Sequence, residues 1–302
     1  MRAHALPCVM PNCVDIVGTG GDGIDTFNVS TCASIVVAGA GVTVMKHGNR
    51  SNSSKCGSAD LLEAIGARLD VDGVQAAEVA RRANFCFLFA QKFHPAMRFV
   101  GPARKQMGVF SIFNILGPLT NPCIPRWQVA GICNKDIGPM YAQALAGLGL
   151  ERALVVMGFE GLDEVSPSGP SHCWEVVNGE VEYKVISPAD FGLPEHDIKE
   201  VAGGEPDENK QTLYDIVDGK KTGAVLDYLL ANAALGLYVA GRGNTLAEVC
   251  IDVYMSPSLY LSISFSFVVC IYEVCCMLLM KIPCYIVTTS DSYKNVTPTF
   301  GR

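Results

Sequence analysis

Short apolar runs alternate along this chain with glycine-rich or polar loops and with longer segments rich in alanine and leucine. Apolar runs bounded by turn residues predict buried strands, and longer periodic segments predict helices. The order strand, glycine loop, helix, strand, polar loop, helix is typical of an α/β fold with mostly parallel strands. The predicted strands lie within 14–23, 42–50, 84–90, 126–133 and 152–159, and the predicted helices within 30–41, 57–69, 138–149 and 224–241.

Local signals mark two helix starts and one tight turn. Ser30 or Thr31 is expected near the start of the first helix, and Ser58 or Asp60 is expected to cap the second. The alternating segment 173–185 has Asn-Gly at its centre, which predicts a β-hairpin.

The last fifty residues differ in pattern from the rest of the chain. Residues 253–272 carry no charge, which is compatible with a membrane span, although Pro257 lies inside the segment. The alternation of apolar residues from 261 to 267 favours a strand instead. A third interpretation is that 250–302 is not the natural end of the domain. The segment does not favour membrane association, and the three interpretations stay open.

Composition narrows the class of protein. The chain has 302 residues, 49% of them hydrophobic, and a net charge of -7, which predicts a folded protein that does not bind nucleic acid wholesale. A local basic pocket for a small anion remains compatible with this charge. The 13 cysteines are scattered without a CxxC pair, and no secretory h-region is visible at the N-terminus. These features favour reduced thiols and a cytoplasmic protein.

The segment "GTGGDGIDTFNVST" (18–31) follows the first predicted strand. Backbone N–H groups of a glycine loop can converge on an anion, and a helix that starts behind the loop adds further donors. Asn28, Ser30 and Thr31 add side-chain donors. The segment therefore indicates a phosphate site, although a glycine loop alone is equally compatible with a tight structural turn. It matches neither the Walker A nor the GxGxxG pattern.

Two further loops strengthen that interpretation. "KHGNRSNSSKCGSAD" (46–60) places three cations among four hydroxyls, which suits a multiply phosphorylated ligand, although a solvated basic loop is the simpler alternative. "GLDEVSP" follows another predicted strand and carries Asp163 and Glu164. Adjacent carboxylates beside phosphate loops suit Mg²⁺, whereas an isolated acidic pair is more often an exposed turn.

Five segments together resemble a known family. "GTGGDG…TFNVST", "KHGNRS-SSK-GSAD", "HPAMR-V-PARK-MG", "FNILGPLTNP" and "GLDEVSP", in this order and spacing, resemble the anthranilate phosphoribosyltransferases of tryptophan biosynthesis. The likeness extends from about Val14 to Val249. Pyrimidine nucleoside phosphorylases share the wider fold but lack "FNILGPLTNP". The resemblance implies a mostly parallel α/β sheet flanked by helices, of the nucleoside phosphorylase/phosphoribosyltransferase type.

The resemblance also implies substrates and site residues. The family transfers the phosphoribosyl group of 5-phosphoribosyl-1-pyrophosphate to anthranilate and releases pyrophosphate. The positions that match its phosphoribosyl pyrophosphate site are Gly18, Gly21, Asp22, Thr26, Asn28, Ser30, Thr31, Lys46, Gly48, Asn49, Arg50, Ser51, Ser53, Ser54 and Ser58.

Anthranilate and metal positions follow from the same resemblance. Those that match the anthranilate site are Gly18, His47, Asn49 and Arg104, and those that match the Mg²⁺ site are Ser30, Asp163 and Glu164. Lys46, His47 and Asn49 are the residues expected to act in catalysis. A neutral aromatic amine needs no strong general base, so His47 is only the nearest candidate, and His94 is interpreted as structural.

The chain departs from the family pattern at both ends. The family's small helical domain, which forms its dimer contact, is expected to be largely missing, so the homodimer implied by the resemblance is in doubt. We expect a remnant at 1–13, an α/β domain at 14–249 and an atypical tail at 250–302. A non-catalytic fragment or pseudoenzyme that only binds phosphates is therefore an alternative to a working enzyme, as is a related nucleoside phosphorylase.

Overall fold

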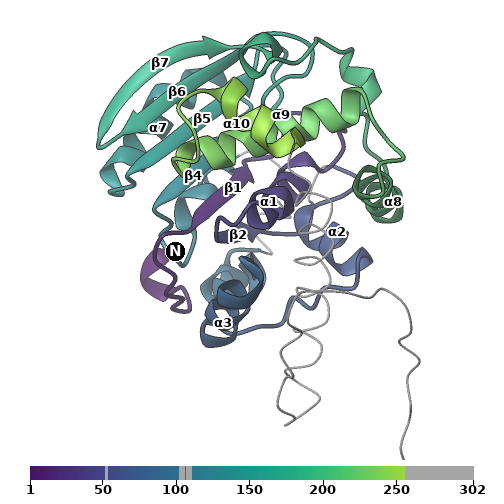
Figure 1. Cartoon of the computed structure of the whole chain (residues 1–302). Helices are drawn as coiled ribbons and strands as arrows, with labels where there is room; N and C mark the ends of the chain where they lie inside the picture. Colours follow the sequence, from purple (N-terminus) through teal and green to yellow (C-terminus); the bar gives the residue numbers. More distant parts are fainter. Residues whose placement is uncertain (52–53, 102–105, 107–110, 256–302) are drawn as a thin grey trace, which may run out of the picture.

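One seven-stranded sheet organises the protein (Figure 1). The computed structural model describes residues 1–51, 54–101, 106 and 111–255. The strand order is β3-β2-β1-β4-β5-β6-β7. The strands are β1 Val14–Gly18, β2 Val44–Gly48, β3 Phe85–Phe89, β4 Trp127–Gly131, β5 Arg152–Gly158, β6 Ser171–Val177 and β7 Glu180–Ile186.

The sheet is mixed but mostly parallel. Strands β1 to β5 pair in parallel, whereas β6 pairs antiparallel with β5 and β7 pairs antiparallel with β6. Asn178 and Gly179 join β6 to β7 with φ of 50° and 91°, the left-handed conformations that a two-residue hairpin turn requires. The predicted fold class, the five predicted strands and the hairpin are confirmed.

Helices cover both faces of the sheet because successive residues of a strand point to opposite sides. In β4 and β5, Val129 and Leu154 belong to one core, which they share with α1 (Val29–Gly39) and α9 (Ala224–Val239). Ala130 and Val155 belong to another core, on α7 (Gly138–Gly147). The remaining α-helices among the described residues are α2 Ser58–Ala64, α3 Gly73–Ala83, α4 Ala90–Phe93, α6 Ile112–Ile115, α8 Pro206–Val217 and α10 Leu246–Met255.

Helix α9 lies at the centre of the first core. Its side chains are buried on all sides, since α1, α10 and the sheet surround it (Figure 1). A Cβ on Gly236 would lie 2.6 Å from Ile16 Cδ1, so glycine at this position allows α9 to pack closely on β1.

The helix starts agree with prediction only in part. Asn28 caps α1 by accepting a hydrogen bond from Thr31 N, so Ser30 and Thr31 do lie in its first turn. The cap prediction for α2 is wrong, because the N-cap is Gly57. Asp60 lies in the first turn instead, where its carboxylate accepts from Gly57 N at 3.0 Å. The helix ends at Ala64 rather than near 69, before Gly66 with its φ of 92°.

The N-terminal segment packs onto the α/β unit. Residues 1–13 contain only the short helix η1 (Arg2–His4), and the described residues form no separate helical domain ahead of β1. The Arg2 guanidinium donates to Leu119 O at 2.7 and 3.0 Å, and Leu6 N donates to Phe93 O at 2.8 Å.

Helix α10 crosses the predicted domain boundary at Val249. Cys250 and Val253 are buried in the core around α9, so this helix belongs to the packed unit. The division into three segments stays a prediction, since residues 256–302 lie outside the described part of the chain. Within the described part, no helix is long and apolar enough to span a membrane.

Candidate active site

Parallel strands bring the predicted loops to one edge of the sheet. The loops after β1, β2 and β5 all leave the carboxyl ends of parallel strands, where open α/β sheets bind ligands. Gly20 N donates to Asp163 Oδ2 at 2.6 Å, and Lys46 Nζ donates to Ser30 Oγ at 3.3 Å. Three segments far apart in the sequence therefore meet at this edge.

Three carboxylates gather there. One oxygen from each of Asp22, Asp163 and Glu164 lies within 4.8 Å of the other two. Asp163 N donates to Asp22 Oδ2 at 3.4 Å, which ties the acidic loop to the glycine loop. Sequence reasoning assigned Asp22 to the phosphate loop alone. Its place among the acidic residues depends on the strand order, which no pattern along the chain reveals.

The electrostatics of this cluster favour a bound cation. Burial and the neighbouring Asp22 raise the pKa of Asp163 to about 7. Burial, Asp163 and Asp22 together raise the pKa of Glu164 well above its ordinary value. Buried like charges repel, and a divalent ion that prefers carboxylate oxygens would offset the repulsion. The three residues therefore fit Mg²⁺.

Glycines let the acidic loop approach the strand ends. A Cβ on Gly18 would lie 2.2 Å from Asp163 Oδ2, and a Cβ on Gly131 would lie 1.5 Å from Asp163 O. Gly20, Gly21 and Gly23 have φ of 67°, 86° and 73°, so the loop uses backbone conformations that other residues rarely adopt.

Lys46 lies inside the protein rather than on a solvated loop. It is 1% exposed, and its Nζ donates to Ile16 O at 2.5 Å. Burial lowers the pKa of Lys46 to about 8, although the charges of Asp15 and Glu164 oppose this shift. Asp15 is fully buried beside it, and burial raises its pKa to about 6.

The segment "FNILGPLTNP" supports this buried charge pair. Asn121 Nδ2 donates at 2.8 Å both to Asp15 Oδ2 and to Met45 O. Gly117 O lies 3.2 Å from His47 Nδ1. Sequence reasoning used this segment for its resemblance and did not assign Asn121 a role; a buried amide between two strands has no signature in the sequence.

The second loop is built around α2. Arg50 forms ion pairs with Asp60 and Glu63, at 3.1 and 2.5 Å, so its guanidinium points to the helix. Ser51 Oγ and Ser54 Oγ lie 2.7 Å apart.

Further contacts orient the ends of this loop. Asn28 Nδ2 donates to Cys56 O at 2.9 Å, which joins the loop to the start of α1. Asn49 Oδ1 accepts from Arg50 N, and Gly48 packs against Phe87 and Ser58. Ser53 and Arg104 lie outside the described residues.

His47 is held as a neutral imidazole. Gly117 O can only accept, so Nδ1 carries the proton. The buried Nε2, which has no hydrogen-bond partner among the residues that the structure describes, is then unprotonated. The His94 ring contacts it edge-on at a centroid distance of 5.0 Å. Burial, reinforced by His94, lowers the pKa of His47 to about 3, so it is a poor general base.

This shift makes stability depend on pH. Between about 3 and the ordinary value of 6.5, the unfolded chain binds a proton at His47 that the folded protein does not. Stability contributed by the neutral ring is therefore lost as pH falls through this window. We expect the wild type to lose about 2 kcal/mol more than His47→Asn between about pH 7.5 and about pH 5. Urea unfolding of both proteins at the two pH values measures this, and equal losses would contradict the buried neutral imidazole.

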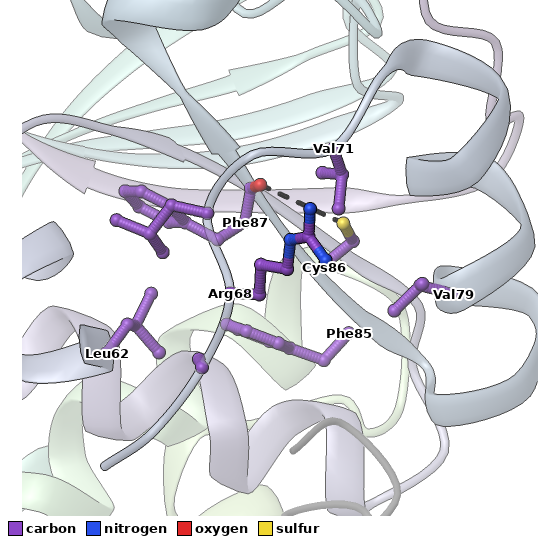
Figure 2. A pocket seen from close by; sticks show the side chains of 9 residues that line it. Leu62, Arg68, Val71, Val79, Phe85, Cys86 and Phe87 are labelled. Atoms are coloured by element: carbon purple, nitrogen blue, oxygen red, sulfur yellow. Dashed lines mark hydrogen bonds between the residues drawn. The ribbon is translucent and has the colours of Figure 1, made fainter. Parts of the chain in front are cut away.

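A small apolar cavity lies elsewhere. It is lined by Leu62, Val79, Phe85 and Phe87 among others, with Arg68 extending across it (Figure 2). Its volume of about 10 Å³ suffices for one water at most. None of its lining residues is a predicted site residue, so it is no candidate for substrate binding.

Comparisons with known proteins agree with the geometry. The family described as "Glycosyl transferase family, a/b domain" matches residues 10–254. The anthranilate phosphoribosyltransferase of Herpetosiphon aurantiacus is 47% identical over 252 residues, which are 82% of this chain and 74% of that protein. The one from Pelotomaculum thermopropionicum is 48% identical over 238 residues, with 79% and 69% covered.

Solved structures give the same result. The Thermus thermophilus anthranilate phosphoribosyltransferase has a TM-score of 0.82 at 38% identity, and 89% of this chain and 82% of that chain are covered. The Saccharomyces cerevisiae enzyme, solved in complex with PRPP and Mg, has a TM-score of 0.82 at 32% identity, with 90% and 76% covered. The chain belongs to the anthranilate phosphoribosyltransferase family.

Proposed function

We propose that this chain transfers the phosphoribosyl group of 5-phosphoribosyl-1-pyrophosphate to the amine of anthranilate and releases pyrophosphate, as in tryptophan biosynthesis. The observation that carries this proposal is the meeting of three carboxylates with a glycine loop at one sheet edge. This arrangement can hold a metal-bound diphosphate, and it occurs in a chain of a family named for this reaction.

The reaction forms an N–C1′ bond and breaks the bond between C1′ and the pyrophosphate oxygen. Positive charge develops on the ribose and negative charge on the leaving group. The Gly20 N–H already donates to Asp163, so the N–H groups from Gly21 to Gly23 are the ones that can serve the phosphates. The Lys46 ammonium, which donates to Ser30 Oγ, adds positive charge at the same edge. The attacking amine is neutral at pH 7, and the low pKa of His47 makes it unsuited to take its proton, so water or a phosphate oxygen accepts it.

Mg²⁺ belongs to the same proposal. Asp163, Glu164 and Asp22 would hold it, and Ser30 stays a predicted further ligand. When bound, it supplies positive charge to the departing pyrophosphate. The yeast relative was solved in complex with PRPP and Mg, which supports this choice of ion.

Arg104 is proposed to grip the anthranilate carboxylate. Arginine can donate two parallel hydrogen bonds to a carboxylate, which lysine cannot. Arg104→Ala is expected to raise the KM for anthranilate about tenfold or more, with little change for the phosphorylated substrate. Steady-state kinetics with each substrate varied in turn checks this. Equal losses for both substrates would contradict the assignment, and Arg104→Lys should recover little.

The activity itself has a direct test. Purified protein with anthranilate, phosphoribosyl pyrophosphate and Mg²⁺ should consume anthranilate, seen as a fall in its fluorescence, and mass spectrometry should find the phosphoribosyl adduct. No consumption with intact Mg²⁺-dependent binding of phosphoribosyl pyrophosphate would favour a non-catalytic binder. Cleavage of uridine or thymidine by phosphate would favour a nucleoside phosphorylase. Cytoplasmic localisation and a homodimer stay predictions, the latter open to light scattering.

A further inference from the structure

A buried tyrosine touches the acidic cluster from α9. Tyr228 is 1% exposed, and its hydroxyl donates to Glu164 Oε2 at 3.2 Å. The same hydroxyl lies 3.5 Å from Thr26 Oγ1. The phenol has one proton, and an ionised carboxylate can only accept, so Thr26 can donate to the phenol oxygen while the phenol donates to Glu164. The hydroxyl thus bridges a carboxylate of the metal cluster and the segment that carries the glycine loop.

Both sides of this bridge are fixed. One turn further along α9, Asn232 donates to Tyr228 O at 3.0 Å and accepts from Val165 N at 3.3 Å, so the helix holds the acidic loop at two points. On the other side, Thr26 forms an isolated β-bridge with Ala202. A hydrogen bond between two rigid segments restricts the carboxylate more than one made to a mobile side chain.

We propose that Tyr228 is a positioning residue that orients the Glu164 carboxylate toward the metal and couples metal binding to the phosphate loop. The inference rests on the proposed function. Among the described residues, the phenol is the one hydrogen-bond donor to the Glu164 side chain. Groups that orient metal ligands set metal affinity even though they do not touch the ion. The sequence predicted only a buried helix at 224–241, because one tyrosine within an apolar segment carries no signal that distinguishes a functional hydroxyl from a core residue.

Tyr228→Phe tests the inference with little change in packing. It keeps the ring and removes the hydroxyl, so the Glu164 carboxylate loses its donor. We expect the dissociation constant of Mn²⁺, used as a paramagnetic probe in place of Mg²⁺, to rise about tenfold. Electron paramagnetic resonance of free Mn²⁺ titrated with the whole protein measures this without requiring activity. Tyr238→Phe is the matched control, since Tyr238 lies on the same helix but packs against Arg152, and its Mn²⁺ affinity should not change.

Two outcomes separate the inference from the proposed function. If the wild type does not bind Mn²⁺, both the proposed metal site and the proposed function are refuted. A wild type that binds Mn²⁺, with Tyr228→Phe binding it equally, would overturn the inference alone.

A second variant tests the coupling, and its single effect can be measured even if Tyr228→Phe does not fold. Thr26→Val removes the other end of the bridge. Isothermal titration at saturating Mg²⁺ should show weaker binding of phosphoribosyl pyrophosphate in Thr26→Val, with a loss in the double variant smaller than the sum of the two single losses. Additive losses, or no loss in Thr26→Val, would contradict a bridge between the two segments.

Discussion

Asp163→Asn combined with Glu164→Gln is expected to reduce kcat/KM for phosphoribosyl pyrophosphate by about a thousandfold or more and to abolish its Mg²⁺ dependence. The two substitutions keep the size of the side chains and remove the charges that would hold the ion. Without the ion, negative charge on the leaving pyrophosphate is no longer offset. Steady-state kinetics across a Mg²⁺ titration measures the effect.

The same double variant should not be less stable than the wild type. Burial and the charge of Asp22 raise the pKa of Asp163, and burial, Asp163 and Asp22 raise that of Glu164, so ionising these carboxyls opposes folding in the absence of metal. A preserved unfolding midpoint would separate loss of function from loss of structure. Glu160→Gln is the matched control, because Glu160 is an exposed carboxylate on the same connection, outside the cluster. Retained activity in the double variant would refute the role of the acidic pair.

Gly131→Ala is expected to have the second largest effect, although it removes no functional group. The added Cβ would lie 1.5 Å from the backbone oxygen of Asp163, and a backbone atom cannot rotate away. The acidic loop must therefore shift, and a displacement of about 1 Å in a catalytic group can cost about a hundredfold in rate. We expect a loss of that order in kcat/KM together with a lower unfolding midpoint.

Gly147→Ala provides the comparison. Gly147 ends α7, and a Cβ there would meet no atom within 4 Å. Alanine also favours the helix, so activity should be unchanged and stability equal or slightly higher. Measuring kcat/KM and the unfolding midpoint of Gly131→Ala and Gly147→Ala under the same conditions tests this expectation. Normal activity in Gly131→Ala would show that the acidic loop need not pack against β4.

Local order explains why much of the fold could be predicted. The glycine loop between 18 and 23, the apolar strands and the Asn178–Gly179 turn are each specified by residues close in sequence. The cap of α2 could not be assigned in this way. Gly57, Ser58 and Asp60 lie within four residues of one another, and the sequence does not show which of them is the cap. In the structure Gly57 is the N-cap, and the Asp60 carboxylate, which also accepts from Ser51 N at 3.1 Å, lies in the first turn.

The candidate site was predictable as segments but not as an arrangement. Strand β4 pairs with both β1 and β5. This strand order places Gly131 against the backbone of Asp163 and brings Asp22 close to Asp163 and Glu164. The hydrophobic periodicity of the chain does not predict this strand order. Asn121 and Tyr228 were missed because each supports the site from a segment whose sequence reads as loop or buried helix.

The central claim is that the acidic pair and the glycine loop jointly hold a metal-bound diphosphate. A crystal of this chain grown with phosphoribosyl pyrophosphate and Mn²⁺, measured at the manganese absorption edge, tests it most directly. The anomalous peak should lie within about 2.2 Å of carboxylate oxygens of Asp163 or Glu164, with the diphosphate against the loop at 18–23. A peak away from both carboxylates, or a diphosphate bound elsewhere, would contradict the account.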